Sequence, residues 1–390
     1  MLTSMKKQRY LFMFVAFLFW LPNFLYLPTL SPYLEYMGGN YSFIGIVLSS
    51  YGIMQLICRF PIGIGADLLK VRKTFMIIGM LASAISCLLF FISNHLWWFL
   101  VARSLAGFAA ATWVVFTVFY PSYYEPSQVH KAMSSISFIV VISQFIGMSF
   151  SGMLVDEFGW KAPFLLSVIF STVGFILSFF IKETEEINKQ PIKLKQVAAV
   201  LKDSLLLKSA FLSIVAHCMI FSTMFGFTSN YALKIGFETN ELTWVVFSFM
   251  IPHALATLFI GEVLVPRFGK WKSLKASFLI SSISILLFPI IHMKFLFFII
   301  QAISGFFLGL IFPVLLGMSI ENIEINKRAT AMGAYQALYA IGIFAGPFFT
   351  GIINSMMGLE AGFGFVGILG ILATILTLIW GNTREKFKKI

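Results

Sequence analysis

Long segments without a charged residue recur along this chain, and they constrain its fold more than any other feature. The hydrocarbon core of a lipid bilayer is about 30 Å thick, and about 20 apolar helical residues cross it. Inside lipid each unpaired backbone polar group costs several kcal/mol, so such segments must form helices. The sequence therefore predicts an all-α integral membrane protein with twelve transmembrane helices. The charge-free segments are residues 10–34, 36–58, 74–102, 104–124, 132–155, 162–181, 209–233, 242–261, 276–293, 295–320, 329–359 and 361–383.

The positive charges lie mainly on one side of the expected membrane. Only 11% of the residues are charged, and the 28 Lys and Arg exceed the 16 Asp and Glu to give a net charge of +12. With a cytoplasmic N-terminus, 23 of the 28 fall on the cytoplasmic side, whereas Lys161, Lys234 and Lys294 fall on the other. This bias predicts a multi-pass protein of the cell membrane (inner or plasma) with both termini in the cytoplasm. Because the basic residues never gather on one soluble face, we expect the lipid bilayer, and not a nucleic acid, as the partner of this protein.

A charged connection near the middle divides the chain. We predict an N-terminal six-helix bundle over residues 1–181, a cytoplasmic linker over 182–208 and a C-terminal six-helix bundle over 209–390. Within the linker, apolar residues recur at helical spacing at Val197, Val200, Leu201 and Leu205. A short helix on the inner membrane surface and a solvated linker both remain open.

The two halves repeat at an offset of 198 to 199 residues. A repeat of an even number of spans keeps its orientation, so the bundles should be related by a pseudo-two-fold axis along the membrane normal. Such an arrangement leaves a cavity that opens to either side in turn. The matched pairs are Tyr33 and Tyr231, Gly38 and Gly236, Gly63 and Gly261, Gly107 and Gly305, Met133 and Met332, Gly147 and Gly346, and Gly152 and Gly351.

Three short motifs accompany the repeat. The loop after the second span reads Gly63-Ile64-Gly65-Ala66-Asp67-Leu68-Leu69-Lys70-Val71-Arg72-Lys73, the fourth span contains Arg103-Ser104-Leu105-Ala106-Gly107, and the first contains Pro28-Thr29-Leu30-Ser31-Pro32. Together these features resemble the major facilitator superfamily of secondary transporters over the whole chain, in its drug or metabolite efflux branches. The first motif departs from the family pattern by one extra residue between Asp67 and Arg72. The resemblance implies alternating access for a small-molecule substrate by a functional monomer.

The resemblance also implies a gate at the inner face. Gly63 should let a neighbouring helix approach closely, and Asp67 should lie where the positive end of a facing helix favours an anion. Asp67 with Arg72 and Lys73 would then latch the inner face, although a plain surface anchor is the alternative. Antiporters of the family tend to carry a Gly-Pro-x-x-Gly-Gly string in the fifth span. That string is incomplete at residues 147–152 here, whereas Gly346 and Pro347 match its first two residues at the equivalent place in the eleventh span.

Arg103 and Arg59 are the cations that fall within spans. An arginine there usually faces a cavity or a partner, so both are candidates for substrate binding or coupling. Snorkelling of Arg103 to the outer interface and a structural role of Arg59 at the inner gate are the alternatives. All sixteen carboxylates fall at span ends or in loops. This pattern predicts neutral or anionic solutes over permanent cations.

Histidines, amides and aromatic rings complete the candidate set. His217 and His253 lie within spans, and histidine, with an ordinary pKa of about 6.5, can carry protons at cellular pH. Each could instead only bond a neighbouring helix. The other candidates could contact a substrate, bridge helices or line an interface. They are Asn23, Gln55, Gln144, Gln336, Tyr26, Trp113, Tyr335 and Tyr339.

These observations predict a secondary active transporter that exports a small amphipathic or metabolite-like solute, driven by a proton gradient without a bound cofactor or metal. Uptake symport of a small organic or inorganic anion held by Arg59 and Arg103 is the alternative, and a membrane sensor is a further one. The chain contains no P-loop lysine motif and no His-Glu-x-x-His helix, so we do not expect an enzyme. Its three cysteines, Cys58, Cys87 and Cys218, are expected to be packing residues.

Overall fold

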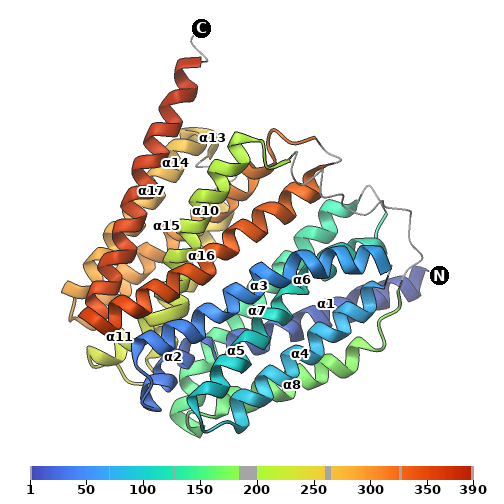
Figure 1. The fold of residues 1–390 in the computed structure, drawn as a ribbon, viewed down its shortest axis with the longest axis horizontal. Coiled ribbons are helices and arrows are strands. Elements are labelled where there is room, and N and C mark those ends of the chain that lie inside the picture. Colours follow the sequence, from blue (N-terminus) through green and yellow to red (C-terminus); the bar gives the residue numbers. More distant parts are fainter. Residues whose placement is uncertain are drawn as a thin grey trace. The chain divides into compact units, whose positions relative to one another are not determined.

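A computed structural model shows a chain built from α-helices (Figure 1). Among the residues that it describes, ten helical segments are long and apolar enough to cross a membrane. Two shorter apolar helices, Ala162–Ser178 and Leu242–Thr257, complete the twelve that the charge-free segments predict. The described residues are 2–69, 71–125, 128–183, 200–259, 265–324 and 327–387.

Six spans make up the first half of the chain. The first and fourth spans are each built from more than one helical piece, because the helix is interrupted within the span. In order, the elements are α1 (Leu2–Leu25), α2 (Leu27–Tyr36), α3 (Tyr41–Leu69), α4 (Arg72–Ile92), α5 (Leu96–Ala111), α6 (Trp113–Phe119), η1 (Tyr120–Tyr123), α7 (Val129–Phe158) and α8 (Ala162–Ser178).

The second half repeats this pattern. Its first span is also interrupted, here by the π-helical turn η3. In order, the elements are α10 (Ser204–Ser222), η3 (Thr223–Phe227), α11 (Thr228–Lys234), α12 (Leu242–Phe259), α13 (Val265–Phe268), α14 (Lys270–Leu287), η5 (Phe288–Ile290), α15 (Lys294–Ile320), α16 (Arg328–Met357) and α17 (Leu359–Phe387).

The third and fourth spans meet at a different place from the one that the charges predict. The charge-free segment 74–102 contains a turn, because α4 ends at Ile92 and α5 begins at Leu96. Arg103 therefore lies inside α5 instead of marking its start. α3 likewise continues through Arg59 as far as Leu69. A charged residue delimits a span only when water must solvate it, and both of these arginines are buried among protein groups.

Contacts divide the chain into two compact units, Met1–Met37 with Ser50–Leu194 and Gly38–Ser49 with Lys195–Ile390. The same helix pairs recur in each unit. α1 packs on α7 and α4 packs on α8 in the first, as α10 packs on α16 and α14 on α17 in the second. The domain boundaries predicted from the sequence stay a prediction. Most of the expected linker helix falls in residues 184–199, outside the described residues, while Val200 is buried with Leu206 and Ala331.

The internal repeat extends to the closest helix contacts. Gly107 of α5 lies against Tyr51 of α3, where an added Cβ would be 2.5 Å from the Tyr51 carbonyl oxygen. At an offset of 198 residues, Gly305 of α15 lies against Phe249 of α12, where an added Cβ would be 2.3 Å from the Phe249 carbonyl oxygen. Glycine at both positions lets the backbones approach closely. The matched position Gly261 lies outside the described residues.

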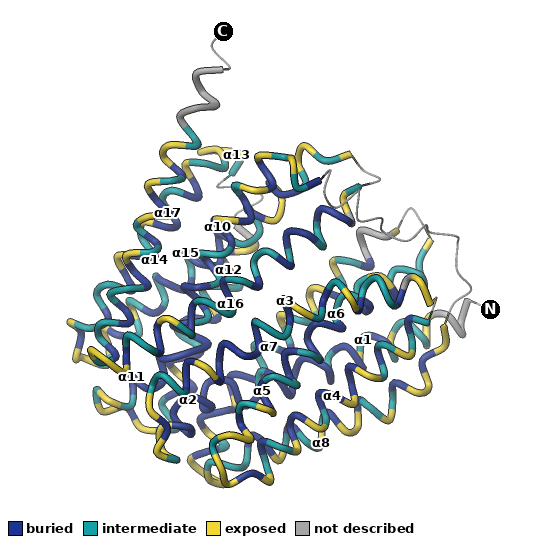
Figure 2. Tube along the Cα trace, viewed as in Figure 1, coloured by how far each residue is buried: buried dark blue, intermediate teal, exposed yellow. Residues whose placement is uncertain are grey.

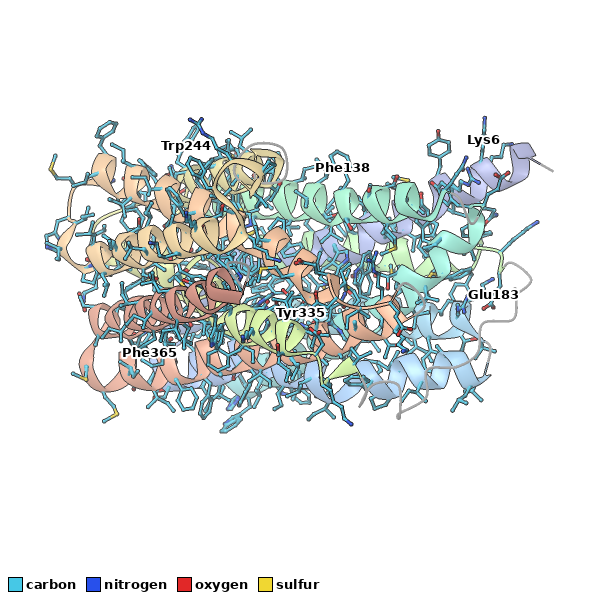
Figure 3. The ribbon with its side chains drawn as sticks, turned by 90° about the horizontal axis from the view of Figure 1, so that it is seen from above. Lys6, Phe138, Glu183, Trp244, Tyr335 and Phe365 are labelled. Atoms are coloured by element: carbon cyan, nitrogen blue, oxygen red, sulfur yellow. The ribbon has the colours of Figure 1, made fainter. Side chains whose placement is uncertain are left out.

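Apolar side chains also cover much of the outer surface of each unit. Exposed positions recur along the outward faces of the helices (Figure 2). Phe138 of α7 and Trp244 of α12 are 61% and 56% exposed, and both lie at the surface in Figure 3. Large exposed rings on long apolar helices suit a surface that faces lipid.

Candidate functional site

A buried arginine forms the centre of a polar site in the first unit. Arg103 of α5 is 2% exposed, and its Nη1 donates a hydrogen bond of 3.2 Å to the Tyr26 hydroxyl. Its guanidinium carbon lies 4.1 Å from the centroid of the Tyr51 ring on α3, which is a cation–π contact. Nε of Arg103 is buried without a hydrogen-bond partner, and no ion pair of the described residues includes this side chain. Among the described residues, the groups that contact this positive charge are neutral.

The proline motif of the first span positions Tyr26. Pro28 lies in the first turn of α2, where a residue without an N–H is tolerated and the preceding helix cannot simply continue. The helix of the first span is interrupted at Tyr26, between the last residue of α1 and the first of α2. The Thr29 hydroxyl donates to the Tyr26 carbonyl at 3.2 Å, which satisfies one group at the break. The fully buried Tyr26 ring packs against Phe90 and Phe164.

Two further predicted residues lie on the same helix face as Tyr51. Gln55 and Arg59 follow Tyr51 on α3 at intervals of four residues, so the three side chains share one face. Arg59 Nη2 donates to Gln55 Oε1 at 2.7 Å, and both side chains are buried. Arg103 and its partner Tyr26 thus meet this face of α3 at Tyr51, and Gln55 and Arg59 lie one and two turns further along it. We call these five residues the arginine site.

The remaining candidates of the first unit do not join the arginine site through any contact described here. Asn23 Nδ2 donates to the Phe19 carbonyl at 2.9 Å and lies 3.5 Å from Ser83 Oγ, which links α1 to α4. Trp113 stacks on Phe19 at 5.9 Å between ring centroids, within an aromatic cluster. Gln144 is half-buried on α7.

An aromatic enclosure holds one of the two predicted histidines in the second unit. The His217 ring on α10 lies parallel to the Tyr339 ring on α16, with centroids 4.1 Å apart and an angle of 3°. Phe312 of α15 meets it nearly edge-on at 4.9 Å, and Phe221 lies at 6.3 Å. We call these four residues the histidine box. The Tyr335 hydroxyl donates to Ser213 Oγ at 2.9 Å, and that oxygen lies 3.3 Å from His217 Nδ1.

The second histidine has a different setting. His253 Nδ1 of α12 lies 3.2 Å from the Gly305 carbonyl oxygen of α15, and because a carbonyl only accepts, Nδ1 donates. An added Cβ on Gly309 would be 2.4 Å from the His253 carbonyl oxygen, so the two backbones cross tightly here. His253 therefore joins two closely packed helices. Gln336 is half-buried on α16, one residue after Tyr335.

The repeat locates a residue that motif analysis missed. Gln301 occupies the position equivalent to Arg103, and Met224 the position equivalent to Tyr26, both at an offset of 198. Gln301 is 1% exposed, and its Nε2 lies 3.3 Å from Met224 Sδ. The same pair of positions is in contact in both halves, but only the first half carries a charge there. The repeat offset of 198 residues, applied to Arg103, would have identified Gln301 from the sequence.

The predicted inner gate is only partly described. The side chain of Asp67 lies outside the described part of the structure. An added Cβ on Gly63 would meet the Val114 methyls at 3.8 Å, which is ordinary contact, so the close helix approach expected there is not found. At Gly346 the approach is close, because an added Cβ there would be 2.7 Å from the Cys218 Cα. The Pro347 carbonyl oxygen lies 2.5 Å from an added Cβ on Gly45, within the same unit.

A carboxylate that the sequence did not single out caps α4 at this face. Glu183 accepts the backbone N–H of Arg72 at 2.7 Å and that of Lys73 at 3.3 Å. An acid is favoured there, because the first N–H groups of a helix lack intrahelical partners and carry partial positive charge. Lys73 Nζ donates to the Phe179 carbonyl at 2.7 Å. The two basic residues of the motif therefore tie α4 to the segment after α8.

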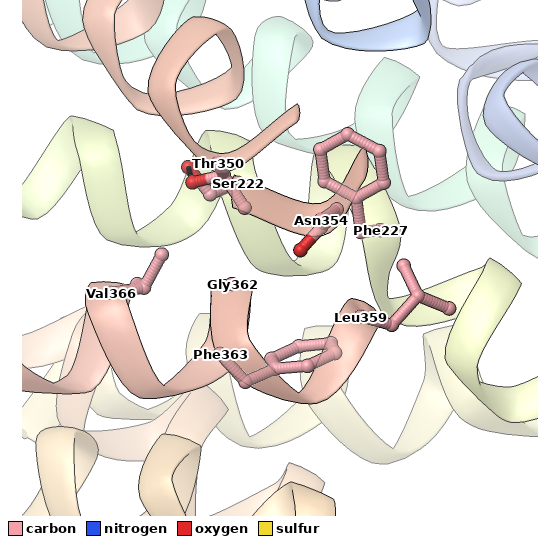
Figure 4. A pocket seen from close by; sticks show the side chains of 8 residues that line it. All are labelled: Ser222, Phe227, Thr350, Asn354, Leu359, Gly362, Phe363 and Val366. Atoms are coloured by element: carbon pink, nitrogen blue, oxygen red, sulfur yellow. Dashed lines mark hydrogen bonds between the residues drawn. The ribbon is translucent and has the colours of Figure 1, made fainter. Parts of the chain in front are cut away.

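A small pocket lies between α10, η3, α16 and α17 (Figure 4). Its empty volume is about 140 Å³, and Thr350 donates to Ser222 Oγ within it at 3.0 Å. The buried Asn354 amide also lines it, and an added Cβ on Gly362 would be 1.8 Å from Asn354 Oδ1. Solute pockets start at about 300 Å³, so this space is a packing feature of the second unit.

Comparison with known sequences identifies the family. The sequence model of the Major Facilitator Superfamily matches residues 12–239 and residues 210–389. The chain belongs to this superfamily. It is similar to multidrug resistance protein 2 of Bacillus subtilis (strain 168), with 23% identity over 98% of each chain. It is also similar to the inner membrane transport protein YajR of Escherichia coli (strain K12), with 24% identity over 94% of this chain and 80% of YajR.

Solved structures share the fold. The nucleoside transporter NupG has a TM-score of 0.76 at 17% identity, over 96% of this chain and 98% of NupG. A bacterial homologue of the human lysosomal transporter Spinster, in an inward-facing and unoccupied conformation, has a TM-score of 0.79 at 13% identity, over 98% of both chains. The expected fold of twelve helices in two domains is confirmed, and the protein is a multi-pass secondary transporter that takes small-molecule substrates.

Proposed function

We propose that this protein couples the proton gradient to the export of small amphipathic or metabolite-like solutes that are neutral or anionic. The observation that carries the proposal is Arg103. A buried cation is costly and is usually paired with an anion. Here the Tyr26 hydroxyl and the aromatic rings of Tyr26 and Tyr51 are its described partners. A solute with a negative or strongly electronegative group can provide the missing acceptor, whereas a permanent cation would be repelled.

Export is supported by a relative rather than by geometry. One relative, from Mannheimia succiniciproducens, is named a probable sugar efflux transporter and is 22% identical over 94% of this chain and 91% of that relative. Its name indicates export. A proton-coupled uptake symporter for a small anion is the second candidate. The observation that favours it is the arginine site, which contains two buried cations, Arg103 and Arg59. An anion entering a negatively charged cell needs an accompanying cation, which a proton can supply.

Purified protein in liposomes distinguishes these possibilities. The probes are 2-naphthalenesulfonate as a permanent anion, uridine as a neutral solute and ethidium as a permanent cation. A liposome interior more acidic than the medium drives accumulation by antiport, and a more alkaline interior drives it by symport. We expect the anion or the neutral solute to accumulate with an acidic interior. Accumulation of ethidium alone would contradict the proposed substrate class, and accumulation only with an alkaline interior would replace export by uptake.

Thermal stabilisation widens the search for the substrate. A ligand that binds only the folded protein raises the unfolding temperature in proportion to its affinity and concentration. Pools of metabolites, sorted by charge, can therefore be screened against purified protein before flux is measured. We expect stabilising pools among the anions and neutral solutes. The Arg103→Gln variant is the control, because stabilisation that survives this change does not arise at the arginine site.

A further inference from the structure

The imidazole of His217 is fixed in one tautomer. His217 Nδ1 lies 2.7 Å from the Ser213 carbonyl oxygen, one turn earlier on α10. A carbonyl oxygen only accepts hydrogen bonds, so Nδ1 carries a hydrogen in both charge states of the ring. Any change of protonation therefore takes place at Nε2. The ring is half-buried, so it is neither sealed in the core nor free in solvent.

Two neighbours hold this ring in place from a second helix. The Tyr335 hydroxyl of α16 donates to Ser213 Oγ, and the Tyr339 ring, one turn later on α16, lies flat against the imidazole. Tyr335 is 2% exposed and lies inside the bundle in Figure 3. α16 thus provides the aromatic face beside the ring and, through Ser213 Oγ, a link to Nδ1. Tyr335 and Ser213 are positioning residues in this arrangement.

We propose that His217 binds the transported proton at Nε2, and that the Tyr339 ring stabilises the imidazolium by a cation–π contact. This rests on the proposed proton-coupled function. Nε2 takes a proton from water on one side of the membrane and returns it to water on the other, so the ring ends each cycle unchanged. Aromatic faces attract cations, and the histidine box supplies a parallel face at 4.1 Å.

The groups around the box fit this role better than those around His253. Among the described contacts, the titratable side chains beside His217 are Tyr339 and, through Ser213, Tyr335, both of α16, while α15 contributes Phe312 and α10 contributes Phe221. From α12, the His253 ring lies 6.1 Å from the Phe312 ring, measured between centroids. His253 itself bonds across a tight crossing of α12 and α15. A charge at that crossing would disturb packing, so His253 is a structural link.

Nuclear magnetic resonance of histidine tests the proton site without any substrate. The chain has five histidines, so selective ¹³Cε1 labelling of the full-length protein in nanodiscs gives a countable set of signals. We expect the signal that His217→Gln removes to titrate between about pH 5 and 8. The same signal should titrate in Tyr339→Phe, which keeps the aromatic face. In Tyr339→Leu, which lacks that face, the midpoint of its titration should lie at least one pH unit below that of the wild-type protein. A His217 signal that does not move over this range, or that titrates identically in Tyr339→Leu, would overturn the proposal.

Flux in liposomes tests coupling. With 2-naphthalenesulfonate as the probe, His217→Gln should lower gradient-driven accumulation at least ten-fold while exchange without a gradient falls less than three-fold. His95→Gln, on an exposed position before α5, is the matched control and should leave both rates and the titrating signal unchanged. Equal loss of both rates would mean that His217 binds solute and does not carry the proton. If wild-type protein moves no probe, the proposed function fails on its own, and the titration still decides the proton site.

Discussion

Arg103 is a buried positive charge of the first unit, and its role can be tested by substitution. Arg103→Gln places in the first half the residue that the second half carries at the equivalent position, Gln301. Hydrogen bonds to charged groups contribute about 1.5–3 kcal/mol, so we expect binding of an anionic solute to weaken roughly ten- to hundred-fold. The measurement is the affinity of the detergent-purified variant for the best anion of the stabilisation screen.

The apo protein provides the counter-test for Arg103. Removing a buried cation that lacks a counter-charge relieves a desolvation cost, so the unfolding temperature of Arg103→Gln without solute should equal or exceed that of wild type. Arg103→Lys keeps the charge but loses the planar contact with Tyr51, and we expect intermediate affinity. A variant that unfolds far below wild type while its affinity is intact would show that Arg103 is only structural.

An ion pair outside the spans predicts a dependence of stability on pH. Lys294 Nζ lies 2.5 Å from Glu241 Oε2, and this hydrogen bond, with that from the Glu238 N–H, holds the pKa of the Glu241 carboxyl below its ordinary value. A depressed pKa in the folded state stabilises the fold at pH values above the unfolded pKa of about 4.3. This contribution is lost as the pH falls through the folded pKa.

We therefore expect Glu241→Gln to lower the unfolding temperature slightly at pH 7 and not at all once the pH is below the folded pKa of Glu241, since the wild-type carboxyl is then protonated too. The effect should shrink at high salt, because both side chains are partly exposed. Thermal unfolding over this pH range in two salt concentrations measures it. A difference between the two proteins that stays constant down to the lowest pH would contradict the ion-pair explanation.

Close glycine contacts are the features that hold neighbouring spans together at the scale of elements. Gly107→Ala would bring a methyl within 2.5 Å of the Tyr51 carbonyl oxygen and 2.8 Å of its Cα. Backbone atoms cannot rotate away, so α3 and α5 must separate, at a cost of about 1–3 kcal/mol. The unfolding temperature should fall, and anion affinity with it, because Tyr51 also contacts Arg103.

Gly317→Ala in α15 is the matched control for this contact. Nothing lies within 4 Å of an added Cβ there, and alanine is favoured over glycine in a helix by up to about 1 kcal/mol. This variant should be as stable as wild type or slightly more so. Equal destabilisation by both substitutions would mean that loss of glycine itself, and not the crossing of α3 and α5, is responsible.

The spans could be predicted from the sequence, whereas the arginine site could not be assembled from it. Charges are costly in lipid, so their absence located twelve helices. The same rule misplaced the junction of the third and fourth spans, because Arg103 is solvated by protein groups. Its contacts with Tyr26 and Tyr51 join residues 77 and 52 positions away in the sequence. Local periodicity carries no information about such distant pairs, and only packing brings them together.

At the scale of the whole molecule, the distribution of charge predicts which side of the membrane each loop occupies. Within the first unit, the start of α1 and the end of the sixth span lie together. Gln8 Oε1 accepts the Lys182 N–H at 3.0 Å, and Lys6 and Glu183 lie at the same end of the structure in Figure 3. An even number of crossings therefore separates them, as twelve crossings separate the two termini.

We expect both termini to be cytoplasmic, because 23 of the 28 basic residues then remain inside. Green fluorescent protein folds in the cytoplasm but poorly when it is exported unfolded, so its fusions after Lys182 or at the C-terminus should fluoresce. Fusions of alkaline phosphatase at the same places should be inactive. A fusion in the loop at Lys161, one span earlier than Lys182, should show the reverse pattern. If the phosphatase is active at Lys182 or at the C-terminus, the charge bias does not set the orientation. The direction of transport would then have to be assigned with the molecule inverted.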